Sequence, residues 1–328
     1  MSRFPFGIPN SWYLVGYSDE LTGDTLRPLP YLGRNMIALR GEDGAVSVLD
    51  GWCPHLGANL AVGATCEQGT LRCPFHGWRF DASGRCVEIP YAKRIPEAAR
   101  LARYPVLERN GMIFVWGGEE GVEPFFEIPV IPEWQDPAWT DRWMRFEWTV
   151  ATHPQEISEN GVDSPHLHTV HLMEPVEDYR LRFEGPAYFW SIGVSKEFQT
   201  LPEFSDGFTM KGENWGLAYS LIRQRGRFNT IVITSFTAVD DETTCIKMAI
   251  LAERNEMDDD ALQAELEGYM KEHGKVAEQD FEIWENKRYE PNPVLCDSDG
   301  PIAEHRRWAS QFYGGEAAAR GSSVARRA

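Results

Sequence analysis

Cysteine and histidine are scarce in this sequence, with six and eight residues among 328. So few cysteines exclude a disulfide scaffold for a chain of this length, and a reducing cytosol keeps such thiols free. Positive charge is scarce as well, because 32 Lys and Arg face 50 Asp and Glu and leave a formal net charge of −18. A nucleic-acid partner needs a basic surface that replaces the counterions of phosphates. We therefore expect no nucleic acid as a partner.

Long apolar runs are absent too. No run reaches the roughly 18 residues that a membrane-spanning helix needs. The first residues, MSRFPFGIPNSWYL, lack a basic segment that leads into an apolar one. We expect no membrane span and a cytoplasmic protein. The sequence also lacks a Gly-x-Gly-x-x-Gly fingerprint behind a strand, so we expect no flavin or NAD to be bound by this chain.

Short strand-like runs fill the first third of the chain, and the pattern changes near residue 119. Turn signals such as Asn110-Gly111 separate these runs and predict hairpins. An acidic, proline-rich stretch over 119–140 then predicts a connecting segment. Further strand-like runs and a long helical pattern over 257–287 predict an antiparallel sheet covered by a helix.

These patterns predict an α+β chain of two domains. The composition, with 42% hydrophobic and 25% charged residues, supports globular domains and not disorder. The predicted ranges are 1–118 for an all-β domain, 119–313 for a domain of an antiparallel sheet and a long helix, and 314–328 for a flexible tail.

The scarce thiols and imidazoles gather in one short span. Cys53-x-His55 and, after seventeen further residues, Cys73-x-x-His76 place one sulfur and one nitrogen on each of two tight loops. A zinc site also takes two Cys and two His, but usually as one Cys pair and one His pair. Mixed pairs suit a two-iron cluster with both cysteines on one iron and both histidines on the other. The spacing thus favours an iron–sulfur cluster over zinc.

This pattern, with its HLG and HGW flanks, resembles the Rieske family. Gly57 and Gly77 allow the loop backbone to close around bridging sulfides, whose charge is met by N–H groups. The resemblance implies an all-β Rieske domain whose four Cys and His ligands hold a [2Fe-2S] cluster. Respiratory members carry two further cysteines that brace the loops, where this chain has Ala58 and Phe75, and a hydroxyl residue in place of Trp78. The chain is therefore similar to the lower-potential oxygenases and ferredoxins of the family.

Three more histidines, His166, His168 and His171, lie in the segment DSPHLHTVH. An oxygen-activating ferrous site uses two imidazoles and one carboxylate on one face of the iron. Asp163-x-x-His166 followed by His171 resembles the motif of Rieske non-haem iron oxygenases. On an ideal helix, positions 166 and 171 differ by roughly 140°, too far for one metal, so we expect Pro165 to interrupt the helix. His168 remains a competing ligand, although we expect it at the surface or beside the ligands.

The long predicted helix offers a carboxylate as the third ligand. At about 100° per residue, Asp280 lies in the middle of the apolar face. A carboxylate buried among apolar groups is costly unless it meets a cation, so Asp280 predicts a metal, with hydrogen bonding to the backbone as the alternative. The segment QDFEIW also resembles the late aspartate motif of these oxygenases. The apolar face comprises Leu262, Leu266, Tyr269, His273, Val276, Ala277 and Trp284, and the far side carries Glu267, Glu278, Glu282 and Glu285.

The resemblance to Rieske non-haem iron oxygenases implies roles for these residues. The catalytic domain would have the helix-grip, START-like fold, and its two histidines and Asp280 would hold mononuclear Fe(II). Asp163 would link His166 to His76 of the partner subunit as a hydrogen-bonded bridge, which requires a ring and most simply a homotrimer. If Asp163 only caps a helix, this argument for an oligomer fails. Asn160 is a weaker candidate for a residue beside the ligands.

The expected reaction follows from the two iron centres. Activation of O2 needs two electrons per turnover, so a separate NAD(P)H-dependent reductase, with or without a ferredoxin, is expected as a partner. Residues 291–313 are similar to the C-terminal segment of 3-ketosteroid 9α-hydroxylase oxygenase components and of the cholesterol 7-desaturase group. This implies a monooxygenase acting on a bulky, apolar, steroid-like substrate. The alternatives are a hydroxylase or O-demethylase of smaller aromatic molecules and a Rieske electron-transfer protein without oxygenase activity.

Overall fold

The computed structural model describes residues 3–171, 177–193, 209–226, 228–254 and 259–314. The chain forms two compact units, a smaller one of Trp12–Gly117 with Gly121–Val130 and a larger one of the remaining residues. The predicted flexible tail lies, beyond residue 314, outside the described residues.

The smaller unit consists of short antiparallel strands in three sheets, which confirms the predicted all-β fold. The strands are β1 (Ser11–Tyr17), β2 (Arg27–Leu29), β3 (Met36–Arg40), β4 (Val46–Asp50), β5 (Thr65–Glu67), β6 (Thr70–Arg72), β7 (Arg79–Phe80), β8 (Cys86–Glu88), β9 (Arg103–Tyr104), β10 (Val106–Arg109) and β11 (Met112–Gly117). Their orders are β1-β11-β10, β2-β3-β4-β9 and β5-β6-β7-β8. Asn110 and Gly111 form the predicted two-residue turn between β10 and β11, with φ of 56° and 73°, as a type I′ hairpin requires.

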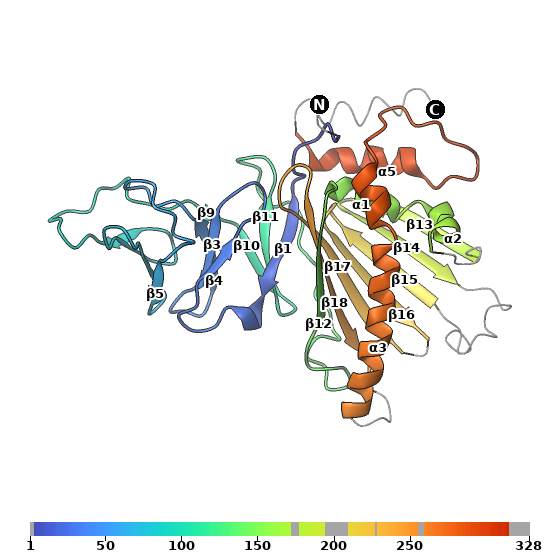
Figure 1. The fold of residues 1–328 in the computed structure, drawn as a ribbon, viewed down its shortest axis with the longest axis horizontal. Coiled ribbons are helices and arrows are strands. Elements are labelled where there is room, and N and C mark those ends of the chain that lie inside the picture. The colour runs from blue at the N-terminus through green and yellow to red at the C-terminus, as the bar shows by residue number, and fades with distance from the viewer. Residues whose placement is uncertain (1–2, 172–176, 194–208, 227, 255–258, 315–328) are drawn as a thin grey trace. The chain divides into compact units, whose positions relative to one another are not determined.

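The larger unit is built on one antiparallel sheet of seven strands in the order β12-β18-β17-β16-β15-β14-β13. The strands are β12 (Met144–Val150), β13 (Glu177–Glu184), β14 (Ala187–Gly193), β15 (Thr209–Trp215), β16 (Tyr219–Arg225), β17 (Thr230–Ala238) and β18 (Thr244–Ala252). The helices are α1 (Pro154–Asn160), α2 (Ser164–Thr169), α3 (Asp259–Glu278), α4 (Phe281–Asn286) and α5 (Ile302–Ala309). Figure 1 shows α3 lying along one face of this sheet. None of the helices described in the structure is long and apolar enough to cross a bilayer.

The single helix predicted over 257–287 is wrong in one respect, because it is broken. α3 ends at Glu278 and α4 begins at Phe281. At the break, the N–H of Asp280 donates to the carbonyl of Ala277 at 3.3 Å, a bond to the third preceding residue that tightens the last turn. Asp280 itself is the N-cap residue of α4, and the N–H of Trp284 donates to its carbonyl at 3.0 Å. The break leaves Asp280 buried, with 6% of its surface exposed.

Two groups of apolar side chains fasten these helices to the sheet. Leu262 and Leu266 pack against Ala252 at one end of β18, whereas Trp284 packs against Ile246. These two β18 positions are six residues apart, or about 20 Å along a strand. Burial of each leucine side chain contributes about 2 kcal/mol to the stability of the fold.

The two predicted faces of the long helix are found in part. The glutamates predicted on the far side are exposed. Val276 was expected on the apolar face but is 43% exposed, and the side chain of His273 lies outside the described residues.

Residues from both ends of the described chain close the larger unit. The carbonyl of Arg3 accepts from the N–H of Tyr289 at 3.0 Å, and the N–H of Asn10 donates to the carbonyl of Phe312 at 2.7 Å. Phe6 stacks on Tyr313 with ring centroids 5.2 Å apart. Segments that flank the smaller unit in sequence are therefore joined within the larger one.

Candidate functional site

Two loops of the smaller unit carry the paired Cys and His residues, and they have the same backbone geometry. In each loop the cysteine N–H donates to the carbonyl five residues later, at 2.9 Å for Cys53 and 2.8 Å for Cys73. Gly57 and Gly77 donate back to these cysteine carbonyls at 2.9 and 3.1 Å. The two glycines have φ of 71° and 72°, a region that glycine adopts without strain. The loops therefore close as two matching turns.

The side chains of these loops converge. The rings of His55 and His76 have centroids 4.7 Å apart, and Cys53 and Cys73 are each only 3% exposed. His55 stacks on Trp78 at 4.6 Å, and the Trp78 indole N–H donates to the hydroxyl of a tyrosine, residue 91, at 2.8 Å. The structure thus brings together all four residues that the spacing singled out.

Two buried atoms at this site fit a metal cluster. Burial, with the thiol of Cys73 nearby, raises the pKa of the Cys53 thiol to about 11, so a thiolate there at neutral pH requires a cation. Nδ1 of His76 is buried and has no hydrogen-bond partner among the described residues. A buried nitrogen without a partner is costly unless it binds a ligand. The donor set of two sulfurs and two nitrogens suits a [2Fe-2S] cluster.

In the larger unit, one histidine lies in α2 and the other shortly after it. α2 begins at Ser164 and ends at Thr169, so His171 lies beyond the helix end. Pro165 lies in the first turn of α2, where a proline is tolerated, and it does not interrupt the helix. The helical segment is broken near Pro165 as expected, at 161–163, but this break precedes both histidines and does not separate them. The angular mismatch between His166 and His171 is removed instead by the early end of α2.

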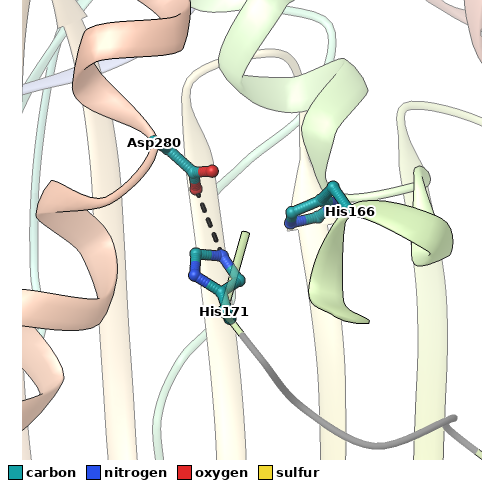
Figure 2. Close-up of side chains that lie close together, drawn as sticks. All are labelled: His166, His171 and Asp280. Atoms are coloured by element: carbon teal, nitrogen blue, oxygen red, sulfur yellow. Dashed lines mark ion pairs between the residues drawn. The ribbon is translucent and has the colours of Figure 1, made fainter. Parts of the chain in front are cut away.

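His166, His171 and Asp280 converge on one point (Figure 2). One ligand atom from each lies within 4.8 Å of the others, and Nε2 of His171 is 3.5 Å from Oδ2 of Asp280. Two imidazoles and a carboxylate are the donor set of a non-haem ferrous site with open positions. His168 is exposed and is not part of this group.

Hydrogen bonds on the outer side of the imidazoles fix their orientation. Nδ1 of His171 is 2.8 Å from Oε1 of Gln279, and Nδ1 of His166 is bonded to the carbonyl of Asp163. Since both partners are acceptors, each Nδ1 carries the proton and each Nε2 bears the lone pair that could bind a metal, although at His166 this lone pair accepts a hydrogen bond from Asn160 in the structure. Contact with Asp280 raises the pKa of His171.

The side chain of Asn160 contacts both His166 and Asp280. Its Nδ2 lies 3.1 Å from Nε2 of His166 and 3.1 Å from Oδ2 of Asp280. Asn160 was predicted only as a weaker candidate for a residue beside the ligands, and Gln279 was not predicted. The one available signal for Gln279 was its position directly before Asp280. Asp163 is the N-cap residue of α2, but its carboxylate makes no capping hydrogen bond.

A cavity of about 1140 Å³ opens onto these residues. It lies within the larger unit, between the sheet and α3, and His166, His171 and Asp280 are part of its wall. Most of the remaining wall is apolar, with Trp190, Ile192, Met210, Ile222, Phe228, Val232 and Met248 among the lining side chains. An apolar cavity with a few polar groups at one point is the usual form of a small-molecule site.

Comparisons with known proteins agree with this geometry. The Rieske [2Fe-2S] domain model matches residues 11–105, and the 3-Ketosteroid 9alpha-hydroxylase C-terminal domain model matches residues 115–313. A probable 3-ketosteroid-9-alpha-monooxygenase oxygenase component of Rhodococcus rhodochrous is 33% identical, over 94% of this chain and 81% of its own length. Cholesterol 7-desaturase of Caenorhabditis elegans is also 33% identical, over 93% of this chain and 77% of the relative.

Solved structures share the fold. Dicamba monooxygenase bound to dicamba superimposes with a TM-score of 0.73 over 97% of this chain and 99% of that chain, at 18% sequence identity. The caffeine complex of a Pseudomonas putida protein gives the same TM-score over 95% of this chain and 94% of that chain, at 17% identity. With both domain models matched in this order, the chain belongs to the Rieske non-haem iron monooxygenases, as an oxygenase component with a 3-ketosteroid 9α-hydroxylase C-terminal domain.

Proposed function

We propose that this oxygenase component hydroxylates a bulky, apolar, steroid-like molecule with O2 and electrons from a separate reductase. The observation that carries the proposal is the apolar cavity of about 1140 Å³ that ends at His166, His171 and Asp280. Burial of a ligand's apolar surface in such a cavity contributes about 25 cal/mol per Å². The cavity therefore favours a large hydrocarbon skeleton over a small polar molecule.

The charge of the cavity wall also favours an apolar substrate. A small aromatic acid would need a buried cation to offset its carboxylate. Among the described residues that line the cavity, Lys275 is the only lysine or arginine, and its side chain is exposed. The two relatives are named for a 3-ketosteroid and for cholesterol, which are both large and apolar.

We assign the two iron centres to the residues that the sequence predicted. The [2Fe-2S] cluster is held in domain 1–118 by Cys53, His55, Cys73 and His76, and Fe(II) is held in domain 119–313 by His166, His171 and Asp280. When bound, the cluster stores an electron and the mononuclear iron supplies O2 activation. Gln279 and the carbonyl of Asp163 hold the imidazoles in place, and the apolar walls exclude water from the reacting carbon.

We infer that Asp163 links His166 to His76 of the partner subunit, which requires a homo-oligomer and most simply a trimer. The carboxylate of Asp163 is not used as a helix cap, and this supports a role outside α2. The reductase is NAD(P)H-dependent and acts directly or through a ferredoxin. The site of action that we propose is the cytoplasm.

The test is a substrate comparison with the purified protein. We expect a red-brown protein with about three irons per chain, two in the cluster and one at the second site. With a generic reductase and NADH, it is expected to hydroxylate steroids and to leave methoxylated benzoates unchanged, as measured by mass spectrometry of the products. Turnover of the benzoates alone would favour the aromatic hydroxylase or O-demethylase. A cluster that is reduced and reoxidised without any product would favour the electron-transfer protein, and a colourless zinc protein would overturn the whole assignment.

A further inference from the structure

The large cavity has a group of polar side chains on α3 and two strands. Nε2 of Gln224 on β16 donates to the hydroxyl of Tyr269 on α3, and both residues line the cavity. Thr230 on β17 is the direct cross-strand partner of Gln224, so their side chains share one face of the sheet. Gln224 is 7% exposed and Thr230 is 1% exposed. These polar groups are therefore shielded from solvent.

This polar group lies far from the iron ligands. Tyr269 precedes Asp280 by eleven residues, which is about 16 Å along a helix. The packing against the sheet also separates the two groups. Residues near Tyr269 pack at the Ala252 end of β18, and those near Asp280 pack at the Ile246 end. The cavity is thus elongated, with the metal ligands at one end and the polar group at the other.

The surroundings of the polar group are apolar. The ring of Phe228 is 5.5 Å from that of Tyr269, and Leu262 and Leu266 belong to the same apolar cluster. A polar side chain in such surroundings is costly unless it is hydrogen-bonded. The hydroxyl of Thr230 is buried beside that of Tyr269 and acts on it together with the amide of Gln224. Gln224, Thr230 and Tyr269 thus meet at one point of an otherwise apolar region, where a polar atom of a ligand would find hydrogen-bonding groups.

We propose that Gln224 and Tyr269, with Thr230 beside them, bind a hydroxyl or ketone oxygen at the end of an elongated apolar substrate remote from the oxidised carbon. The inference rests on the proposed function and names the polar feature of its substrate. Burial raises the pKa of Tyr269 to about 12, so its hydroxyl stays a donor at neutral pH. The Gln224 amide both donates and accepts, and the pair therefore suits a ketone as well as a hydroxyl. The distance from this oxygen then selects the carbon that faces the metal site.

The test compares two ligands and four proteins. A 3-ketosteroid and its analogue without that oxygen are titrated against the holoenzyme, and binding is followed by quenching of the fluorescence of tryptophans such as Trp190, which lines the cavity. The unchanged protein is expected to prefer the ketosteroid by roughly ten-fold, the value of a good hydrogen bond to a buried partner. Tyr269→Phe and Gln224→Leu are expected to lose this preference and to hydroxylate a mixture of carbons. Thr234→Val removes a hydroxyl elsewhere in the same cavity and is the matched control, expected to keep the preference.

The outcomes separate this inference from the proposed function. Equal affinity of the unchanged protein for both ligands overturns the polar anchor, and so does a preference that survives in both Tyr269→Phe and Gln224→Leu. A loss of preference in Thr234→Val as large as in Tyr269→Phe also overturns it, because the effect would then belong to the cavity in general. If neither steroid binds or is oxidised, the proposed function itself fails. Thermal melting of each variant identifies any that do not fold, and the other anchor variant then decides the result.

Discussion

The two proposed metal sites of this protein are built in opposite ways. The four residues of the smaller unit lie within the short segment 53–76, on two matching turns that are closed by their own backbone hydrogen bonds. The three residues of the larger unit come from the end of α2 and from the break before α4, more than a hundred positions apart. A local site needs little from the rest of the fold, whereas an assembled site depends on the elements that carry it. A substitution in one site is therefore expected to leave the other site intact.

The largest expected effect is the loss of function from one substitution in each site. Asp280→Ala removes the carboxylate from the iron site and is expected to lower product formation below about 1% of the unchanged protein, because the metal loses a ligand. The absorption spectrum of the cluster is expected to remain. Cys73→Ser is the counterpart, expected to abolish that spectrum and to leave about one iron per chain by metal analysis. Loss of the cluster spectrum in Asp280→Ala would show that the two sites are not independent.

A second experiment tests whether the two sites work within one chain or between chains. Cys73→Ser and His171→Ala are each expected to be inactive. When the two variants are refolded together at equal amounts, activity is expected to return to about a quarter of the unchanged protein, since one in four neighbouring pairs joins an intact cluster to an intact iron site. Activity that does not return in a mixed oligomer contradicts the proposed bridge between Asp163 and the partner subunit's His76. Different affinity tags on the two variants, and recovery of both variants by purification on one tag, verify that mixed oligomers have formed.

Acid is expected to weaken the larger unit through two buried histidines. Burial lowers the pKa of His153 and of His305 to about 4, from an ordinary value of 6.5. Between these values the unfolded chain binds more protons than the folded one, so stability is lost as the pH falls from 6.5 to 4. Each histidine accounts for about 3 kcal/mol across the whole window.

Calorimetry at pH 7.5, 6.0 and 4.5 measures this loss. The matched variant is His153→Gln, because Nδ1 of His153 accepts from the N–H of Gln155 at 3.1 Å and a glutamine oxygen can accept the same bond without titrating. This variant is expected to show a smaller change with pH. An unfolding temperature of the larger unit that stays constant from pH 7.5 to 4.5 contradicts the prediction.

The smallest expected effect concerns a residue that holds a proposed iron ligand in place. Gln279→Ala removes the acceptor for Nδ1 of His171 and is expected to weaken iron binding by about 10- to 100-fold, as measured by competition with a chelator. Gln279→Glu keeps an acceptor and is the control, expected to bind iron close to normally. Equal iron affinity in both variants and in the unchanged protein would remove Gln279 from the site.

The contrast between a local and an assembled site also explains what the sequence predicts. Spacing alone selected Cys53, His55, Cys73 and His76, because both loops are complete within a few residues of their own sequence. Asp280 was found by its helical position although α3 ends before it, since the tight turn at the break keeps the side chain on the buried face.

Other features depend on elements that meet only in the folded chain. The role expected for Pro165 was wrong, because Pro165 lies in the first turn of α2 and the helix ends only at Thr169, before His171. Gln279 acts through His171, which lies more than a hundred residues earlier, and no local pattern records that contact. Tyr269 was placed on the apolar face, but its partner Gln224 comes from a distant strand.

The closing of the larger unit by residues 3–11 has a consequence for the order in which the protein is made. All residues of the smaller unit have been synthesised once the chain reaches position 130. The larger unit waits for Phe312, which accepts the hydrogen bond from Asn10. Since folding during synthesis proceeds from the N-terminus, the inserted unit can fold while its host is incomplete. The iron–sulfur cluster can therefore be loaded onto a nascent chain that has no oxidation site yet.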